Sequence, residues 1–346
     1  MEAVKKIRTP RRAAIELPIG SDDTGLPESL SDAELIAGHR LAARSAISVI
    51  ADGAMAVEKI RVRAQVRAKH LKRRAGFCPY TAWLHKETMA LEQKVDELLA
   101  RLVGDHPAAP WFSKVKGTGG EAIGKVIGHI EAFGKFYPVG DPMIPAYVTR
   151  LPEMVPVPQD DTDELVEIPM VWVSGIERLT TPSKLIKYAG FVPGQKRKAG
   201  ELTDHNVELR TMCWRLATSL MKASGKYYNF YETYKARTFA QATGKGIKIL
   251  PTPKGRMCVA CNQVVSLKTA RFCPSCGGAL SLKTEPDGVL YQGHLHQMAM
   301  RRMIKLFLCH LWVEWRKALE LPGRIPYAIE YLGHSQIISP SDMVDR

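Results

Sequence analysis

The spacing of four cysteines constrains the fold of this chain more than any other feature of its sequence. Two Cys-x2-Cys pairs, Cys258 with Cys261 and Cys273 with Cys276, are separated by eleven residues. Each pair forms a knuckle that directs two thiolates at one ion, and the gap is long enough for a β-hairpin that brings the knuckles together. The pattern predicts a zinc ribbon over residues 251–285 that holds one zinc ion. Four thiolates close the coordination sphere, so we expect this zinc to be structural and not hydrolytic.

The other cysteines and the nearby histidines are not expected to bind metal. Paired spacing is typical of metal ligands in a reducing compartment, where disulfides are rare. Cys78, Cys213 and Cys309 stand outside the two pairs and are predicted to be buried or partly buried thiols. His294 and His296 are alternative metal ligands. Because the four-thiolate set is already complete, surface or hydrogen-bonding roles are favoured for both histidines.

Charge and length limit the class of partner. The 346 residues are enough for two or three domains, and 49 Lys and Arg against 35 Asp and Glu leave a formal net charge of +14. This excess favours a polyanion, with DNA or RNA ahead of an anionic membrane surface. No window approaches roughly 18 uninterrupted apolar residues, and the N-terminal stretch lacks a signal-peptide pattern. We therefore expect a cytoplasmic, nucleoid-associated protein without a membrane partner.

The first hundred residues predict an arm and then a helical hairpin. Residues 1–30 are basic and then rich in Pro, Gly, Ser and Asp, which is typical of a flexible arm. A helical pattern over 31–106, broken at Gly76 and Pro79, indicates two helices joined by a turn. The chain is thus expected to begin its ordered part with a helical hairpin.

The first helix of this hairpin is strongly basic. Residues 57–74 hold eight Lys or Arg and one Glu, a net charge of +7 on about five helical turns. One interpretation is a solvated face. The near absence of acidic residues favours phosphate binding instead, with Arg63, Arg67 and Arg74 as the candidate contacts.

A glycine turn between two short amphipathic helices at 111–131 indicates a helix-hairpin-helix motif. In this motif, backbone N–H groups at the start of the second helix bind a DNA phosphate. The candidate residues are Lys116, Gly117, Gly119 and Lys125. The alternative is an ordinary helix–helix turn that uses glycine for its positive φ.

The segments around this motif predict a mainly α domain. Residues 107–250 are assigned to a helical domain, in which the acidic and β-prone stretch 134–176 indicates an insertion with a strand or two and a solvated acidic loop. Asn206 is predicted to cap a helix, and the aromatics that follow are expected to fill a core, with base stacking as the alternative: Tyr227, Tyr228, Phe230, Tyr231 and Tyr234. Residues 286–346 predict a long helix of this domain and a tail. The predicted fold class is mainly α, with a small β zinc ribbon inserted.

Three stretches of the chain share the order found in one family of mobile-element proteins. They are VKGTGGEAIGKVIGHI, then PSKLIKYAGFVPG with AGELTDHNVELRTMCWRLA, and lastly MAMRRMIKLFLCHLWVEWRKALELPGRIPY. Residues 111–340 thereby resemble the C-terminal transposase domain of the insertion-sequence family that includes the Piv invertase and the bridge-RNA-guided recombinases. Family members carry a YAG-aromatic/Leu-x-P turn, a Ser-Gly dipeptide and a polar loop that ends in Leu-Arg on a helix. Arg210 matches that arginine and is a further candidate nucleic-acid contact.

Two departures from the family bear on activity. The resemblance implies an N-terminal RuvC-like domain with four acidic residues for divalent metal, but the first hundred residues resemble only the family's coiled linker. The basic loop with Lys196, Arg197 and Lys198, which are candidate phosphate contacts, resembles the loop that delivers the family's catalytic serine, yet Ala199 stands at the serine position. A methyl group has no oxygen with which to attack phosphorus, so no residue is assigned a catalytic role.

Three functions stay open on the sequence alone. The first is a nucleic-acid-binding protein of a mobile element, related to DNA transposition and recombination, that lacks strand cleavage of its own and has DNA and a structured guide RNA as partners. The second is an active transposase that uses Thr203 or Ser224 as a substitute hydroxyl, or that obtains a nuclease domain from a separate partner chain; a homo-oligomer is also open. The third is a zinc-stabilised adaptor that binds RNA within a larger particle.

Overall fold

Helices make up most of the described chain, with small sheets and a cysteine cluster beside them. The structure is a computed structural model that describes residues 45–74, 76–159, 162–192, 203–253, 255–266, 270, 272–281, 285–323 and 338–345. All of these residues fall within the larger of the two units into which the chain divides, Leu41–Arg346. The prediction of a mainly α chain is confirmed at this level, while the predicted arm at 1–30 lies outside the described residues. Within these ranges, no helix has the length and apolar character needed to cross a membrane.

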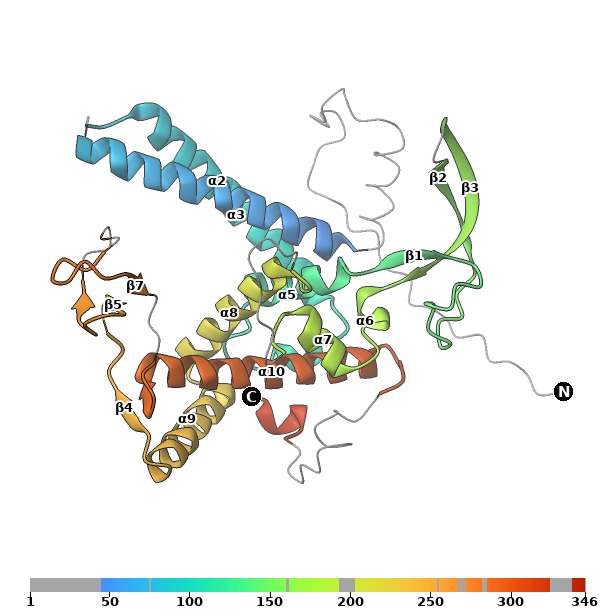
Figure 1. The fold of residues 1–346 in the computed structure, drawn as a ribbon. Helices are drawn as coiled ribbons and strands as arrows, with labels where there is room; N and C mark the ends of the chain where they lie inside the picture. Colours follow the sequence, from blue (N-terminus) through green and yellow to red (C-terminus); the bar gives the residue numbers. More distant parts are fainter. Residues whose placement is uncertain are drawn as a thin grey trace. The chain divides into compact units, whose positions relative to one another are not determined.

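The hairpin predicted from the sequence is seen as helices α2 (Ala46–Arg74) and α3 (Pro79–Gly104), which pack side by side (Figure 1). Gly76 has a φ of +88°, and Pro79 stands in the first turn of α3. Only glycine adopts that φ without strain, and proline at a helix start is pre-organised for the helix, so both residues fix the turn. Residues 31–44 of the predicted hairpin lie outside the described part.

Helix α5 (Gly120–Glu131) contacts both hairpin helices and α8 (Val207–Lys222). All eight residues from 123 to 130 are buried. Three glycines at four-residue spacing allow this close approach, because a Cβ atom at any of them would lie within 2.7 Å of a hairpin side chain: Gly120 against Ala100, Gly124 against Leu99, and Gly128 against Ala51. Residues four apart share one face of a helix, so α5 presents a continuous small-residue stripe to the hairpin.

An antiparallel sheet follows α5, with the strand order β1-β3-β2. Its strands are β1 (Lys135–Pro138), β2 (Glu153–Gln159) and β3 (Thr162–Val173). Within the insertion, the expectation that the acidic run 159–169 forms a loop is wrong for residues 159 and 162–169, which belong to strands β2 and β3. Val157 pairs with Val166, and Val155 with Ile168. β-Branched residues that pair across a hairpin stabilise strands, and here they outweigh the acidic character of the run.

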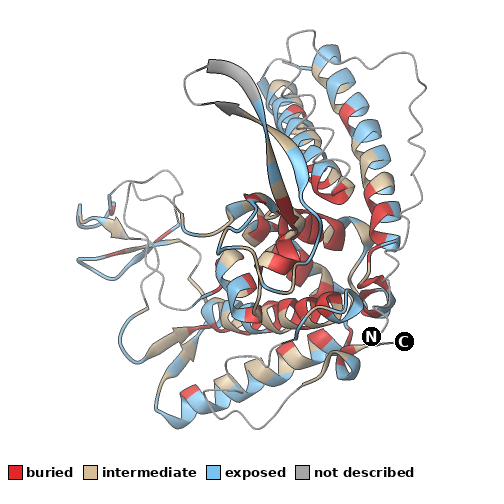
Figure 2. Ribbon diagram, turned by 90° about the vertical axis from the view of Figure 1, so that its right-hand side faces the viewer, coloured by how far each residue is buried: buried red, intermediate tan, exposed pale blue. Residues whose placement is uncertain are grey.

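The remaining helices gather around α10. They are α4 (Ala109–Phe112), α6 (Gly175–Arg178), α7 (Pro182–Tyr188), α9 (Lys226–Gly244), α10 (Gln292–Ala318) and the 3-10 helix η1 (Pro340–Met343). Trp312 of α10 donates a hydrogen bond to the Leu179 carbonyl at 2.6 Å, and buried Arg316 donates to the Ile176 carbonyl at 2.8 Å. These bonds tie α10 to α6, and Figure 2 shows the buried residues concentrated in the central helices.

The helix predicted after Asn206 is divided in two by a turn. The Asn206 side chain accepts a hydrogen bond from the Leu209 N–H at 2.8 Å, which caps α8 as predicted. α8 ends at Lys222, and Ser224 then adopts a φ of +49° before α9 begins. Tyr227 and Tyr231 are both 1% exposed, so the interpretation of these two aromatics as core residues is confirmed.

Short strands frame the cysteine segment. β4 (Lys248–Leu250) pairs in parallel with β8 (Val289–Tyr291). Between them, a three-stranded sheet has the order β6-β5-β7 and consists of β5 (Arg256–Cys258), β6 (Val264–Val265) and β7 (Leu280–Ser281).

The glycine stripe of α5 can be tested by a pair of matched substitutions. Gly128→Ala places a methyl group 2.4 Å from Ala51 Cβ and 2.9 Å from the Ile47 carbonyl oxygen, so we expect a loss of about 2 kcal/mol in the free energy of unfolding. Gly53 is an exposed position of α2, and a Cβ atom there would have nothing within 4 Å, so Gly53→Ala should instead stabilise the protein by about 0.5–1 kcal/mol. Thermal and urea denaturation followed by circular dichroism measures both, and equal effects of the two changes would refute the packing role.

Candidate functional site

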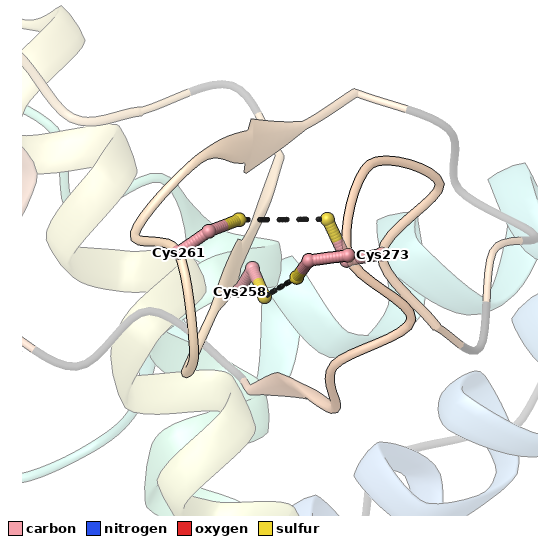
Figure 3. Close-up of side chains that lie close together, drawn as sticks. Cys258, Cys261 and Cys273 are labelled. Atoms are coloured by element: carbon pink, nitrogen blue, oxygen red, sulfur yellow. Dashed lines mark hydrogen bonds between the residues drawn. The ribbon is translucent and has the colours of Figure 1, made fainter.

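The four predicted metal ligands lie together. The Sγ atoms of Cys258 and Cys276 are 3.4 Å apart, those of Cys261 and Cys273 are 3.7 Å apart, and all four lie within 4.8 Å of one another (Figure 3). A tetrahedral ion with metal–sulfur bonds of about 2.3 Å requires sulfur–sulfur distances of about 3.8 Å. The four cysteines therefore form a cluster that can bind a metal ion.

Backbone N–H groups favour the thiolate form of one cysteine in each knuckle. The pKa values of the other two, Cys261 and Cys276, are raised: backbone hydrogen bonds at Gln263 and Gly278 act to lower them, but neighbouring cysteine side chains outweigh this effect. A hydrogen bond from the backbone N–H of Cys261 lowers the pKa of Cys258. In the second knuckle, the backbone N–H of Ser275 lowers the pKa of Cys273 to about 6. N–H groups that point at sulfur stabilise its negative charge, and only a thiolate binds metal well.

A glycine closes the cluster on one side. A Cβ atom at Gly278 would lie 3.0 Å from the sulfur of Cys258 and 3.3 Å from that of Cys276, so a side chain there would press on two ligands. The N–H of Cys273 donates to the Gly278 carbonyl at 2.9 Å, which closes the second knuckle. Cys258 and Cys273 are buried, whereas Cys261 and Cys276 are exposed. Four sulfur ligands leave no open coordination position, so a bound ion would be structural.

The remaining cysteines and the two histidines have other surroundings. Cys213 is buried, and Cys78 and Cys309 are partly buried, as predicted. His294 Nδ1 lies 2.6 Å from a Glu285 carboxylate oxygen, and His296 Nδ1 lies 2.6 Å from the Tyr231 hydroxyl. Both histidines thus make hydrogen bonds outside the cysteine cluster.

The glycine turn predicted to contact phosphate lies between α4 and α5. Gly117 has a φ of +94°, and a Cβ atom there would lie 2.8 Å from Leu220 Cα of α8, so this glycine serves both the turn and close helix packing. Thr118 donates its hydroxyl to the Phe112 carbonyl at 2.6 Å, and Gly119 precedes the first turn of α5. The side chain of Lys116 is exposed beside the turn.

Lys125 does not extend this surface, contrary to the sequence-based expectation. Its side chain is 2% exposed, and its Nζ lies 2.6 Å from Glu121, 3.4 Å from Asp96 and 3.9 Å from Glu58. Burial is the main influence on Asp96 and raises the pKa of that carboxyl. Because α5 is enclosed by the hairpin and α8, Lys125 is confined to an internal ion-pair network and cannot reach a phosphate.

The three candidate arginines of α2 are exposed. Arg63, Arg67 and Arg74 stand four and seven residues apart, so all three fall on one face of the helix. Elsewhere on this helix, Lys59 pairs with Glu208 at 2.9 Å and Arg61 pairs with Glu92. Within the described part of the chain, no ion pair to a carboxylate joins the three arginines, so their charge faces solvent.

The basic loop with Lys196, Arg197, Lys198 and Ala199 lies outside the described residues, but both segments that flank it are described. Near one flank, the Asn206 N–H donates to the Tyr188 carbonyl at 2.9 Å, and the Asn206 side chain donates to the Tyr188 hydroxyl at 2.9 Å.

Arg210 also contacts the segment that precedes the basic loop. It donates a hydrogen bond to the Gly190 carbonyl, and its guanidinium lies 5.6 Å from the centre of the Phe191 ring. Arg210 therefore has a structural role in bringing the two flanks together.

The two substitute hydroxyls lie at opposite ends of α8. Thr203 is half-buried just before the helix, whereas exposed Ser224 follows its last residue. A helix of 16 residues is about 24 Å long, so the structure does not bring Ser224 to the flank where Thr203 lies.

Sequence reasoning missed one anchor at the glycine turn. The Asp345 carboxylate accepts hydrogen bonds from the backbone N–H groups of Lys116 at 2.7 Å and Lys226 at 2.8 Å. Trp111 donates to the Pro340 carbonyl at 3.1 Å. The only local signal was the Ser339-to-Asp342 capping box that orders this segment, which does not reveal its distant partners.

No family model, curated protein or solved structure matches this chain.

Metal content tests the cysteine cluster. The purified protein should contain one equivalent of metal by elemental analysis, and Cys258→Ser or Cys276→Ser should lose it, because a serine hydroxyl is a much poorer ligand than a thiolate. Cys78→Ser is the control, since Cys78 stands in the hairpin turn and should leave the metal in place. Full metal content in either cluster variant would contradict the assignment.

Proposed function

We propose that this chain is a zinc-stabilised nucleic-acid-binding protein of a mobile element, without strand-cleavage chemistry of its own. The observation that supports it most strongly is the arginine face of α2, formed by Arg63, Arg67 and Arg74. Three exposed arginines on one helix face, without carboxylates to neutralise them in the described part, carry the charge that a phosphate backbone requires of its partner.

Zinc is the metal that best fits the cysteine cluster. A closed set of four sulfur ligands near tetrahedral spacing is the donor set of structural zinc sites and of iron–sulfur proteins. The first Cys-x2-Cys knuckle lies at the β5–β6 hairpin, and the second leads into β7, which pairs with β5; this arrangement favours the zinc ribbon among these alternatives. Zinc bound there would stabilise this segment, because metal binding free energy contributes to folding.

The glycine turn before α5 is a second candidate phosphate contact. Backbone N–H groups at the start of α5 and the exposed ammonium of Lys116 suit an anion, as in the helix-hairpin-helix motif that the sequence resembles. Lys125 is excluded from this proposal because it is buried and paired. The resemblance to insertion-sequence transposases adds DNA, and a structured guide RNA, as the expected ligands.

The absence of cleavage chemistry in this proposal rests on Ala199. The resemblance assigns the family's nucleophile to this position, and alanine cannot form a covalent bond to phosphorus. Of the two substitute hydroxyls, only Thr203 lies beside the described flank of the loop, so an active transposase that uses a substitute hydroxyl would act through Thr203 and not Ser224.

Salt-dependent binding tests the arginine face. Replacing Arg63, Arg67 and Arg74 together with Gln should weaken binding to all duplex sequences alike and reduce the logarithmic salt slope by roughly 2.7 units, if each arginine neutralises one phosphate. Fluorescence anisotropy over a series of salt concentrations measures both quantities.

The charge-matched control replaces three exposed cations on other surfaces with Gln: Arg101, Arg237 and Lys245. This control should keep the slope of the unchanged protein. Equal slopes for both triple variants would show that only net charge matters, and no binding by the unchanged protein would refute the proposed function.

A nicking assay on supercoiled DNA tests the active-transposase alternative. Nicking by the unchanged protein that is abolished by Thr203→Ala would support that alternative instead.

A further inference from the structure

The turn of the α2–α3 hairpin exposes three large aromatic side chains. Phe77, Tyr80 and Trp83 are 76%, 80% and 62% exposed. Tyr80 and Trp83 stand three residues apart in the first turns of α3, so they share a helix face, and Phe77 lies in the turn itself. Contiguous exposed aromatics are uncommon on a domain surface unless they bind something. We call these three residues the aromatic tip.

The aromatic tip is surrounded by positive charge. Residues 59–86 contain nine Lys or Arg and no Asp or Glu. Four of these cations lie next to the aromatics and are exposed: Lys72, Arg73, Arg74 and Lys86. An apolar partner surface would leave this charge unpaired, whereas a polyanion would neutralise it, so charge complementarity favours nucleic acid over a protein or a second copy of the chain.

The combination of ring faces and cations selects one form of nucleic acid. In a duplex the base faces are stacked on one another, so exposed aromatics find no partner there. In a single strand or loop, bases are free to stack on aromatic side chains while the phosphates pair with nearby Lys and Arg. The turn is fixed by Gly76 and Pro79, so the rings are attached to a pre-organised element.

We propose that the aromatic tip is a stacking site for unpaired nucleotides at the end of the arginine face, with which it shares Arg74. This inference rests on the proposed function, because it specifies which part of a nucleic acid this end of the hairpin would bind. The stacking residues are Phe77, Tyr80 and Trp83, and the adjacent cations bind the phosphates between the stacked bases.

Binding to two matched probes tests the proposal. The probes are a fluorescein-labelled oligothymidylate and a duplex of the same length. Replacing Phe77, Tyr80 and Trp83 together with Ala should weaken single-strand binding by about tenfold or more and duplex binding by less than about threefold. Tyr80→Phe retains the ring and should bind like the unchanged protein. Phe239→Ala removes an exposed aromatic from α9 and should leave both affinities as they are.

The outcomes separate this inference from the proposed function. If the unchanged protein binds neither probe, both fail. If it binds both probes and the aromatic triple variant weakens them equally, or weakens neither, the stacking site is refuted while the proposed function stands. If the triple variant keeps single-strand affinity but changes mass in light scattering, the tip is a contact between copies of the chain, and the inference is likewise overturned. Circular dichroism checks that each variant is folded.

Discussion

The close packing of α5 against the hairpin is the constraint on which the rest of the described structure depends. Glycine at 120, 124 and 128 removes the side chains that would otherwise hold α2 and α3 away, and the shortest of these approaches involves Gly128 and Ala51. Once α5 is enclosed, its eight residues from 123 to 130 are all buried. The sheet and α6 then continue from its C-terminal end, and α8 packs on its other side.

This enclosure determines which charges are structural and which are free to bind. Lys125 is placed among Glu58, Asp96 and Glu121, and breaking such a buried network by removing one partner would leave uncompensated charge. Toward the hairpin turn, α2 has no such enclosure. Arg63, Arg67 and Arg74 keep their charge at the surface, where we propose that they bind phosphate, whereas the charge of Lys125 is neutralised inside the protein.

How far each feature could be predicted depends on the range of the interactions that form it. The cysteine cluster and the hairpin turn follow from neighbours in sequence, such as Cys258 with Cys261 and Gly76 with Pro79, and local spacing predicted both. The burial of Lys125 and the anchoring of Asp345 depend on partners far away in the chain, which no local pattern specifies. The acidic run at 159–169 shows a third case, since cross-strand pairing outweighed a composition typical of loops.

The length of α2 relates the two proposed binding surfaces to one another. Arg63 and Arg74 are eleven residues apart, or about 16 Å along the helix, and the aromatic tip begins just beyond Arg74. A duplex bound along the arginine face would therefore extend to the aromatic tip, where the rings are proposed to stack only on unpaired bases. Neither proposed surface alone would distinguish a duplex end from a continuous duplex, but their fixed order on one hairpin would. Together the two proposals specify a junction between paired and unpaired nucleic acid as the ligand that satisfies both surfaces at once.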